Sequence, residues 1–175
     1  IRDAMESRGL GDVYQRQTRN YPHTPGIDAA GVIVESNDAS FSAGDEVVVI
    51  GFDLGMDTPG GYGQRIRVPS GWAVKLPSGL SLEESMILGT AGFTAALCVH
   101  KLEAVSMSPD GGPVLVTGAS GGVGSVAVRL LAQLGYEVHA VTGKTEQHGF
   151  LKSLGAQEIL SREDMLAGAE RPLGK

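Results

Sequence analysis

One stretch decides the fold of this chain: Val114-Leu115-Val116-Thr117-Gly118-Ala119-Ser120-Gly121-Gly122-Val123-Gly124-Ser125-Val126-Ala127-Val128. It begins with aliphatic residues that are mostly β-branched, a composition typical of a strand buried on both faces. Past the glycines, apolar residues recur at helical spacing through Val126, Leu130 and Leu134. The stretch therefore predicts a strand, a tight glycine turn and a helix.

The glycines of this turn favour a phosphate-binding loop. Gly118, Gly121 and Gly124 fit the G-x-G-x-x-G pattern loosely, because two residues separate the first pair. The loop lies between a strand and a helix, and a second strand follows at 137–141, which is the context that a dinucleotide site requires. Glycines let the backbone approach a pyrophosphate, and the N–H groups of the helix N-terminus point at it. The alternative is a tight turn without a ligand.

The chain divides near Pro77-Ser78-Gly79. Before this point, Ile1–Met5 is compatible with a helical turn, and short strands separated by turns predict a small β domain over residues 1–80. These strands are expected near 32–34, 46–50, 62–68 and 72–76. Ser81-Leu82-Glu83-Glu84 is a capping box and opens a helix, which glycines interrupt before a second helical stretch from about Thr90 to Glu103.

Residues 81–175 alternate between strands and helices. Strands at 114–117, 137–141 and 158–160 alternate with helical segments, and this order predicts a parallel sheet with right-handed crossovers. The chain does not begin with Met and ends one βαβ unit past the glycine loop. We therefore expect an α/β chain whose β-rich domain and doubly wound domain are both truncated.

Composition excludes several classes of function. The net charge is −6 and no basic block is present, which argues against a nucleic-acid partner. The single cysteine, Cys98, excludes an internal disulfide and fits a reducing compartment. The longest uncharged run, Ser85–His100, is too short and too rich in glycine and threonine to span a bilayer. We expect a cytoplasmic protein that binds neither nucleic acid nor a membrane.

The residues just after the second strand indicate the cofactor. An NAD site places a carboxylate there for the ribose 2′-hydroxyl, whereas an NADP site removes the acid and supplies a cation. Here Val141 is followed by Thr142, Gly143 and Lys144. Lys144 can neutralise a 2′-phosphate, and Thr142 and the Gly143 backbone can donate to it. This pattern favours NADPH; the alternative is an exposed lysine without a role.

Other nucleotide and metal chemistries fit less well. Gly143-Lys144-Thr145 resembles the end of a Walker A loop, but Val138 stands where that motif needs a glycine. The glycine loop also fits short-chain dehydrogenases, which carry it near the N-terminus, whereas more than a hundred residues precede it here. No two of the histidines have ligand-like spacing with Cys98, so we expect no metal. The histidines are His23, His100, His139 and His148.

Several further motifs resemble the medium-chain dehydrogenase/reductase superfamily. They are Tyr21-Pro22-x-x-Pro25-Gly26-Ile27-Asp28-x-Ala30-Gly31, Gly44-Asp45-Glu46-Val47, Gly60-Gly61-Tyr62 and Leu88-Gly89-Thr90-Ala91-Gly92-Phe93-Thr94-Ala95. With Thr117–Gly124 and Tyr136-Glu137-Val138, the chain most resembles the acrylyl-CoA reductase branch, which includes zinc-independent quinone oxidoreductases. Zinc-dependent relatives place a histidine ligand in the Pro-Gly-x-Glu region, where this chain has Ile27-Asp28.

The resemblance implies a GroES-like substrate domain followed by a Rossmann domain, with the active site in the cleft between them and a homodimer as the assembly. It also implies pyrophosphate contacts from Ser120, Gly121, Gly122 and Val123. The 2′-phosphate contacts that it implies come from the segment 142–144, already identified above.

The type of reaction that we expect follows from two groups that the sequence lacks. Without zinc or a Tyr-x-x-x-Lys pair, nothing stabilises the alkoxide formed when a simple ketone is reduced. An activated C=C is easier, because negative charge spreads onto a conjugated carbonyl oxygen. Thr90 and Thr94 are candidates for positioning the nicotinamide or for donating to that oxygen. No proton donor is assigned.

We therefore expect an NADPH-dependent reductase of a short enoyl-CoA such as acrylyl-CoA. A quinone reductase with the same hydride step is the alternative enzyme. A nucleotide-binding protein without turnover is the alternative outside enzymes.

Overall fold

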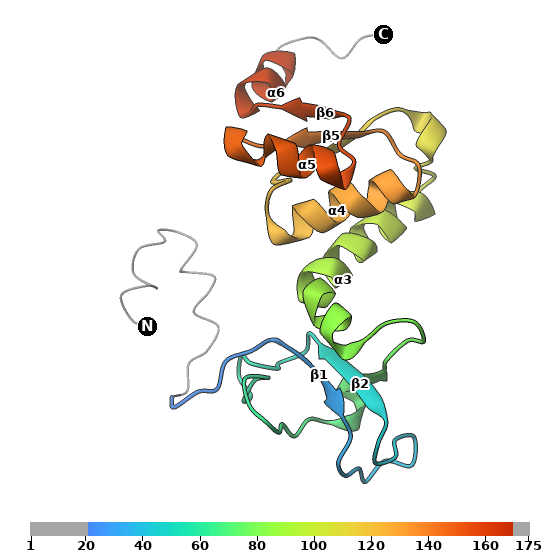
Figure 1. Cartoon of the computed structure of the whole chain (residues 1–175), viewed down its shortest axis with the longest axis vertical. Helices are drawn as coiled ribbons and strands as arrows, with labels where there is room; N and C mark the ends of the chain where they lie inside the picture. Colours follow the sequence, from blue (N-terminus) through green and yellow to red (C-terminus); the bar gives the residue numbers. More distant parts are fainter. Residues whose placement is uncertain (1–20, 170–175) are drawn as a thin grey trace. The chain divides into compact units, whose positions relative to one another are not determined.

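The structure, a computed structural model, describes residues 21–169, and the helical turn expected at 1–5 lies outside them (Figure 1). The chain forms two compact units, one ending at Thr90 and the other beginning at Ala91. The division into domains at residues 80 and 81 stays a prediction. Each unit is described by itself below.

The first unit contains a small antiparallel sheet. Its order is β1 (Asp28–Val32), β2 (Glu46–Ile50) and β3 (Ala73–Lys75), and β2 lies between the other two strands. Pairing places Ala30 opposite Val48 and Val48 opposite Val74. Because β2 is the central strand, its residues 47–49 are buried and form much of the core of this unit.

The strand expected at 62–68 is wrong. Residues 62–67 are exposed and form no regular element, although their side chains alternate in type. The backbone here bonds to a neighbouring loop instead of a strand: the Gly61 N–H donates to the Gly26 carbonyl (2.8 Å) and the Tyr62 N–H to the Pro25 carbonyl (3.0 Å). Alternation is a local pattern, whereas a strand also needs a partner to receive its hydrogen bonds.

The helix α3 (Leu82–Ala104) begins in the first unit and continues into the second. It is kinked at Gly89, whose φ of 49° and ψ of −154° are not helical, in agreement with the predicted interruption. The capping box is confirmed: the Glu84 N–H donates to Ser81 Oγ (3.2 Å), and the Ser81 N–H donates to Glu84 Oε2 (2.9 Å). These bonds satisfy helix-terminal donors that have no partner within the helix.

By length and mean hydropathy (1.3), α3 alone among the helices within residues 21–169 could cross a membrane. The sequence analysis expected no such segment. The kink argues against a span, because the helical part after Gly89 extends only about 22 Å at ~1.5 Å per residue, short of the ~30 Å hydrocarbon core. The absence of a membrane partner stays a prediction.

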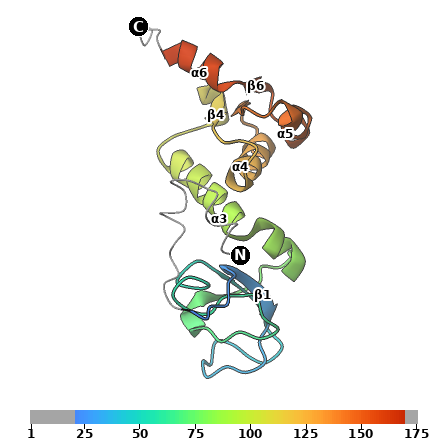
Figure 2. The same ribbon diagram turned by 90° about the vertical axis from the view of Figure 1, so that its left-hand side faces the viewer.

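The second unit is built on a parallel sheet of β4 (Val114–Val116), β5 (Val138–Val141) and β6 (Glu158–Leu160), in that order. The register places Leu115 beside His139 and His139 beside Glu158. Three helices accompany it: α4 (Gly122–Gln133), α5 (His148–Leu154) and α6 (Arg162–Ala169). Figure 2 shows α4 and α5 next to each other, as their mutual contacts require. The predicted strand–helix alternation is confirmed, and α6 is an addition to it.

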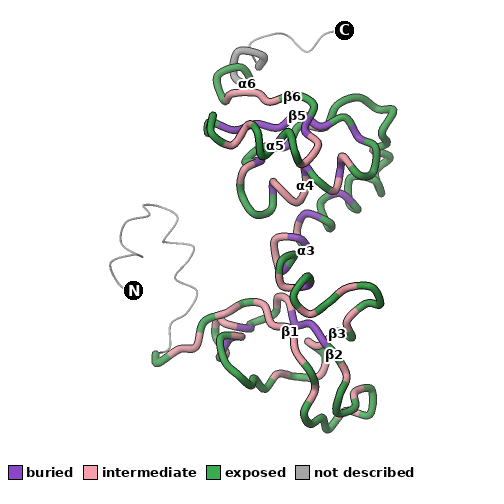
Figure 3. Tube along the Cα trace, viewed as in Figure 1, coloured by how far each residue is buried: buried purple, intermediate pink, exposed green. Residues whose placement is uncertain are grey.

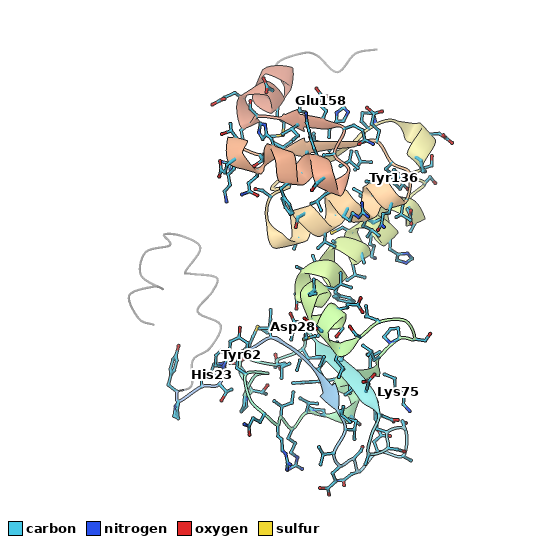
Figure 4. The ribbon with its side chains drawn as sticks, in the orientation of Figure 1. His23, Asp28, Tyr62, Lys75, Tyr136 and Glu158 are labelled. Atoms are coloured by element: carbon cyan, nitrogen blue, oxygen red, sulfur yellow. The ribbon has the colours of Figure 1, made fainter. Side chains whose placement is uncertain are left out.

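The core of the second unit lies between the sheet and α4 and α5. Val128, Val138, Ala140 and Leu151 are all fully buried there, and Figure 3 shows the burial that follows β5. Tyr136, labelled in Figure 4, is also buried, and its hydroxyl donates to Glu103 Oε1 (3.1 Å) and to the Met107 carbonyl (3.2 Å). Burial, together with the hydrogen bond to the Glu103 carboxylate, raises the pKa of Tyr136 above its usual value. This core holds the carboxyl ends of the strands in fixed positions.

Candidate cofactor site

The glycine loop joins β4 to α4 in a tight turn. Gly118 adopts a positive φ of 60°, and the Gly121 N–H donates to the Gly118 carbonyl (2.9 Å). A Cβ on Gly124 would lie 2.3 Å from the Gly118 oxygen, so only glycine fits there. The first N–H groups of a helix have no partner within it. Within the described residues no side chain caps the N-terminus of α4, whose N-cap is Gly121.

The end of β5 lies against this loop. Ser120 Oγ and Thr142 Oγ1 are 3.2 Å apart, and the Lys144 N–H donates to Thr142 Oγ1 (3.1 Å). The Ala119 N–H donates to the Val141 carbonyl (3.3 Å). Thr142 is buried, whereas Lys144 is exposed. The predicted residues Ser120, Thr142 and Lys144 are therefore brought together, although Ser120 lies 22 residues before Thr142 in the sequence.

A pocket at the carboxyl ends of the strands contains four of the residues predicted as cofactor contacts and five that were not assigned that role. The predicted ones are Ser120, Thr142, Gly143 and Lys144, and the others are Thr117, Gly118, Val141, Arg162 and Met165. None of these lining residues is acidic. Gly121, Gly122 and Val123 do not line the pocket and lie at the adjoining start of α4. Two cations, no anion and an uncapped helix N-terminus favour a negatively charged ligand.

Arg162 was missed because α6 was not predicted, although two signals were present. It follows β6 closely, and ligands of open parallel sheets bind outside the carboxyl ends of the strands. Ser161 and Asp164 also form a cap: the Asp164 N–H donates to Ser161 Oγ (3.0 Å) and the Ser161 N–H to Asp164 Oδ2 (3.0 Å). Hydrogen bonding to Ser161 lowers the pKa of Asp164. The Asp164 carboxylate therefore bonds at the start of α6 and does not line the pocket.

Thr90 lies in the first unit, beside a residue that the sequence analysis did not connect with it. The Thr90 N–H donates to Asp28 Oδ2 (3.0 Å), and the Thr90 hydroxyl donates to Asp28 Oδ1 (2.5 Å). Asp28 is the first residue of β1, and Figure 4 shows it at the end of that strand. A sequence separation of 62 residues left no local signal for this pair.

Thr94 lies one helical turn after Thr90 on α3. Ala91, which follows Thr90, belongs to the second unit, and its Cβ lies 3.5 Å from the position that a Cβ on Gly122 would occupy. This part of α3 therefore packs against the start of α4. The roles of Thr90, Thr94 and the loop residues as cofactor contacts stay predictions.

Within residues 21–169, no group of three or more His, Cys, Asp or Glu side chains could hold a metal ion. His139 lies between two carboxylates, with Nε2 2.9 Å from Glu137 Oε1 and Nδ1 3.2 Å from Glu158 Oε2. Both of these glutamates are exposed. Independence from metal stays a prediction.

Two family models match the chain. The alcohol dehydrogenase GroES-like domain matches residues 3–78, and the NAD-dependent epimerase/dehydratase family matches residues 114–165, which contain the glycine loop. The acrylyl-CoA reductase AcuI of Ruegeria pomeroyi is 51% identical over 155 residues, covering 89% of this chain and 47% of the relative. The chain belongs to the medium-chain dehydrogenase/reductase superfamily. Within it, the chain falls in the branch of acrylyl-CoA reductases and quinone oxidoreductases.

Solved structures of this superfamily agree with the fold. The yhdH oxidoreductase of Salmonella enterica in complex with NADP has a TM-score of 0.83 at 53% identity, over 85% of this chain and 46% of that chain. The yhfP protein of Bacillus subtilis with NAD bound has a TM-score of 0.86 at 52% identity, over 90% and 48%. The quinone oxidoreductase of Sus scrofa is 30% identical over 146 residues, covering 82% of this chain and 42% of the relative.

The chain spans about half the length of the curated relatives that it matches. Its GroES-like part and its parallel-sheet part correspond to the two domain types predicted from the sequence.

Proposed function

We propose that the protein is an NADPH-dependent oxidoreductase that reduces an activated C=C bond, with a short enoyl-CoA such as acrylyl-CoA as substrate. The observation that carries the proposal is the pocket at the ends of β4 and β5, where the glycine loop, Lys144 and Arg162 meet and no acidic residue lines the wall. The similarity to AcuI supports the substrate class.

The residues present fit a dinucleotide phosphate. The N–H groups of Gly122 and Val123, at the uncapped start of α4, can bind the pyrophosphate, and Gly121, whose own N–H donates to the Gly118 carbonyl, lies beside them. These three residues are exposed, so a ligand can reach their backbone. Ser120 and Thr142 add hydroxyl groups beside the loop.

The cofactor choice rests on two cations. Lys144 supplies a point charge, and the planar guanidinium of Arg162 can form paired hydrogen bonds with phosphate oxygens. A carboxylate that would accept from the hydroxyls of the NAD ribose is missing from the wall of the pocket. This arrangement supports NADPH over NADH. The relative crystallised with NAD makes the choice worth testing directly.

The bound NADPH would supply the hydride. The chain's own residues would hold it: the glycine loop at the pyrophosphate, Thr142, Gly143 and Lys144 at the 2′-phosphate, and Thr90 and Thr94 at the nicotinamide end. No residue is proposed as a proton donor. A quinone reductase is the second candidate, favoured by the similarity to the quinone oxidoreductase of Sus scrofa. A homodimer in the cytoplasm is the assembly and location that we propose.

A substrate panel tests the reaction. The full-length protein is given NADPH with acrylyl-CoA, crotonyl-CoA and a simple benzoquinone, and NADPH oxidation is followed at 340 nm. We expect the highest kcat/KM with acrylyl-CoA. A higher value with the quinone would establish the second candidate, and saturable cofactor binding without oxidation of NADPH would indicate a binding protein without turnover.

Replacing Lys144 with aspartate tests the cofactor choice. A charge-assisted hydrogen bond contributes roughly 1.5–3 kcal/mol net, and about 1.4 kcal/mol is a tenfold change, so we expect Lys144→Asp to remove a tenfold to hundredfold preference for NADPH. The change should appear mainly in KM, because the site is remote from the hydride. Lys152→Asp is the matched control, because Lys152 is exposed on α5 and does not line the pocket. A preference that survives in Lys144→Asp would show that Lys144 is only a surface residue.

A further inference from the structure

In the contact between Asp28 and Thr90, Thr90 is the hydrogen-bond donor and Asp28 is the acceptor. Asp28 Oδ2 accepts from the Thr90 N–H, and Asp28 Oδ1 accepts from the Thr90 hydroxyl. Accepting at both oxygens is the pattern of an ionised carboxylate, which has no proton to donate. The hydroxyl proton of Thr90 therefore points at Asp28, and any other hydrogen bond at Thr90 Oγ1 must be accepted by that oxygen.

The surrounding backbone holds this pair in place. Asp28 is the first residue of β1 and pairs with Ile50 of β2. Gly89 takes the kink before Thr90, and a Cβ there would lie 2.7 Å from Asp28 Oδ2, so the carboxylate occupies the space that a side chain would need. A carboxylate at the start of the helical segment after the kink is also favoured by the helix dipole. Asp28 thus caps α3 from a different element of the fold.

We infer that Asp28 is a positioning residue that makes Thr90 a hydrogen-bond acceptor for the nicotinamide carboxamide. The inference rests on the proposed function, which assigns Thr90 to the nicotinamide end of the cofactor. The carboxamide is a planar group with an oxygen that only accepts and an NH2 that only donates. A Thr90 oxygen that can only accept selects the NH2, and so it fixes which way the carboxamide is turned.

The direction of the hydrogen bond between Thr90 and Asp28 also excludes Thr90 as a hydrogen-bond donor to the substrate. Donation by Thr90 to the carbonyl oxygen of the substrate would require its proton to leave a charged acceptor, and hydrogen bonds to charged groups are the stronger ones. Thr90 therefore orients the cofactor, and the negative charge that develops on the substrate is stabilised by other groups.

The dissociation constants of two cofactor analogues test the inference without turnover. The first is 3-acetylpyridine adenine dinucleotide phosphate, in which a methyl group replaces the carboxamide NH2 of NADP+. The second is adenosine 2′,5′-bisphosphate, which lacks the nicotinamide half. Calorimetry on the full-length protein should show that NADP+ binds about threefold to tenfold more tightly than the acetylpyridine analogue, the size of one net hydrogen bond.

Variants of Thr90 and Asp28 test whether the difference between the two dissociation constants comes from these two residues. Thr90→Val removes the hydroxyl at nearly constant shape, and we expect it to bring the ratio of the two dissociation constants to about one. Asp28→Asn should lower the ratio as well, because an amide can donate to Thr90 Oγ1 and release its proton. Thr90→Ser keeps the hydroxyl and should keep the ratio. All three variants should bind adenosine 2′,5′-bisphosphate as the wild type does, which shows that they are folded.

The outcomes separate the inference from the function on which it rests. Equal binding of NADP+ and its acetylpyridine analogue by the wild type would overturn the inference, and so would a ratio that survives in Thr90→Val. In either case, tight binding of adenosine 2′,5′-bisphosphate leaves the proposed cofactor standing. A wild type that binds neither NADP+ nor the bisphosphate would overturn the proposed function, and the inference with it.

Discussion

Each unit of the molecule contains a cluster of glycines at which backbone segments meet, and the two clusters serve different purposes. In the first unit, a Cβ on Gly55 or Gly60 would lie within 2.5 Å of backbone atoms of Pro25 or Gly26. In the second unit, a Cβ on Gly124 would meet the Gly118 oxygen at 2.3 Å. Close approach of the backbone is therefore common to both.

The difference lies in the N–H groups. In the first cluster they are bonded within the loop: the Gly60 N–H donates to the Thr24 carbonyl (2.7 Å) and the Gly55 N–H to the Thr58 carbonyl (3.1 Å). In the second cluster, the Gly121 N–H is also bonded within the loop, to the Gly118 carbonyl (2.9 Å), but the loop leads into the start of α4, which no described side chain caps. Glycine content alone thus indicates tight packing, whereas a phosphate site also needs unpaired N–H groups at a helix N-terminus.

The largest effect should come from Gly124→Ala. The added methyl group overlaps backbone atoms that cannot move independently, and overpacking of this kind costs about 1–3 kcal/mol. Denaturant unfolding of the full-length protein should show this loss, and NADP+ binding should fall by more than tenfold because the loop is displaced.

The matched control for Gly124 is Gly149→Ala. Gly149 lies in α5 with nothing within 4 Å of its Cβ position, so alanine there should stabilise the helix by about 0.5–1 kcal/mol. A Gly124→Ala protein as stable as the wild type would mean that the loop is looser than its contacts indicate.

Gly60→Ala sharpens the comparison, because it should affect stability alone. A Cβ there would lie 2.5 Å from the Pro25 carbonyl carbon and oxygen, and we expect a loss of about 1–3 kcal/mol in the unfolding of the first unit. The dissociation constant of NADP+ should stay within about twofold of the wild-type value, since the N–H groups of this loop already have partners.

Gly31→Ala is the control for Gly60, because Gly31 lies in β1 with open space around its Cβ position. A large loss of NADP+ affinity in Gly60→Ala would show that the two glycine clusters are not as different as their hydrogen bonds suggest.

The same contrast explains what the sequence could predict. The order of β4, the loop, α4 and β5 follows from residues that are neighbours along the chain, and all four elements were predicted. The segment 62–68 has an equally regular pattern, but at its start the Tyr62 N–H donates to the Pro25 carbonyl, a contact that no local pattern reveals. The link from Asp28 to Thr90 is non-local in the same way.

The cofactor site was predicted in part for a related reason. Thr142 and Lys144 were predicted because they follow the end of the second strand, and Ser120 because the glycine loop resembles that of the acrylyl-CoA reductase branch; all three line the pocket. Arg162 belongs to a short helix with few apolar residues, so periodicity did not show it. Its cap of Ser161 followed three residues later by Asp164 was nevertheless a readable signal of the kind that was used at Ser81 and Glu84.

These two caps, one in each unit, provide the smallest effect, a dependence of stability on pH. Hydrogen bonds from Ser81 lower the pKa of Glu84, and hydrogen bonding to Ser161 lowers the pKa of Asp164. Each carboxyl thus has a lower pKa folded than unfolded, where values near 4 are usual. Its contribution is present above the unfolded pKa and is lost as pH falls through the folded pKa.

Denaturant unfolding between about pH 5 and pH 3 should therefore show a fall in stability that is smaller in Glu84→Gln and smaller again in Glu84→Gln/Asp164→Asn. Both carboxyls are exposed, so other acidic groups will account for most of the total fall. Glu163→Gln removes a charge from the same helical turn as Asp164, without removing a partner of Ser161, and should leave the fall closer to that of the wild type. Equal slopes in all four proteins would mean that the caps hold their carboxylates too weakly to affect folding.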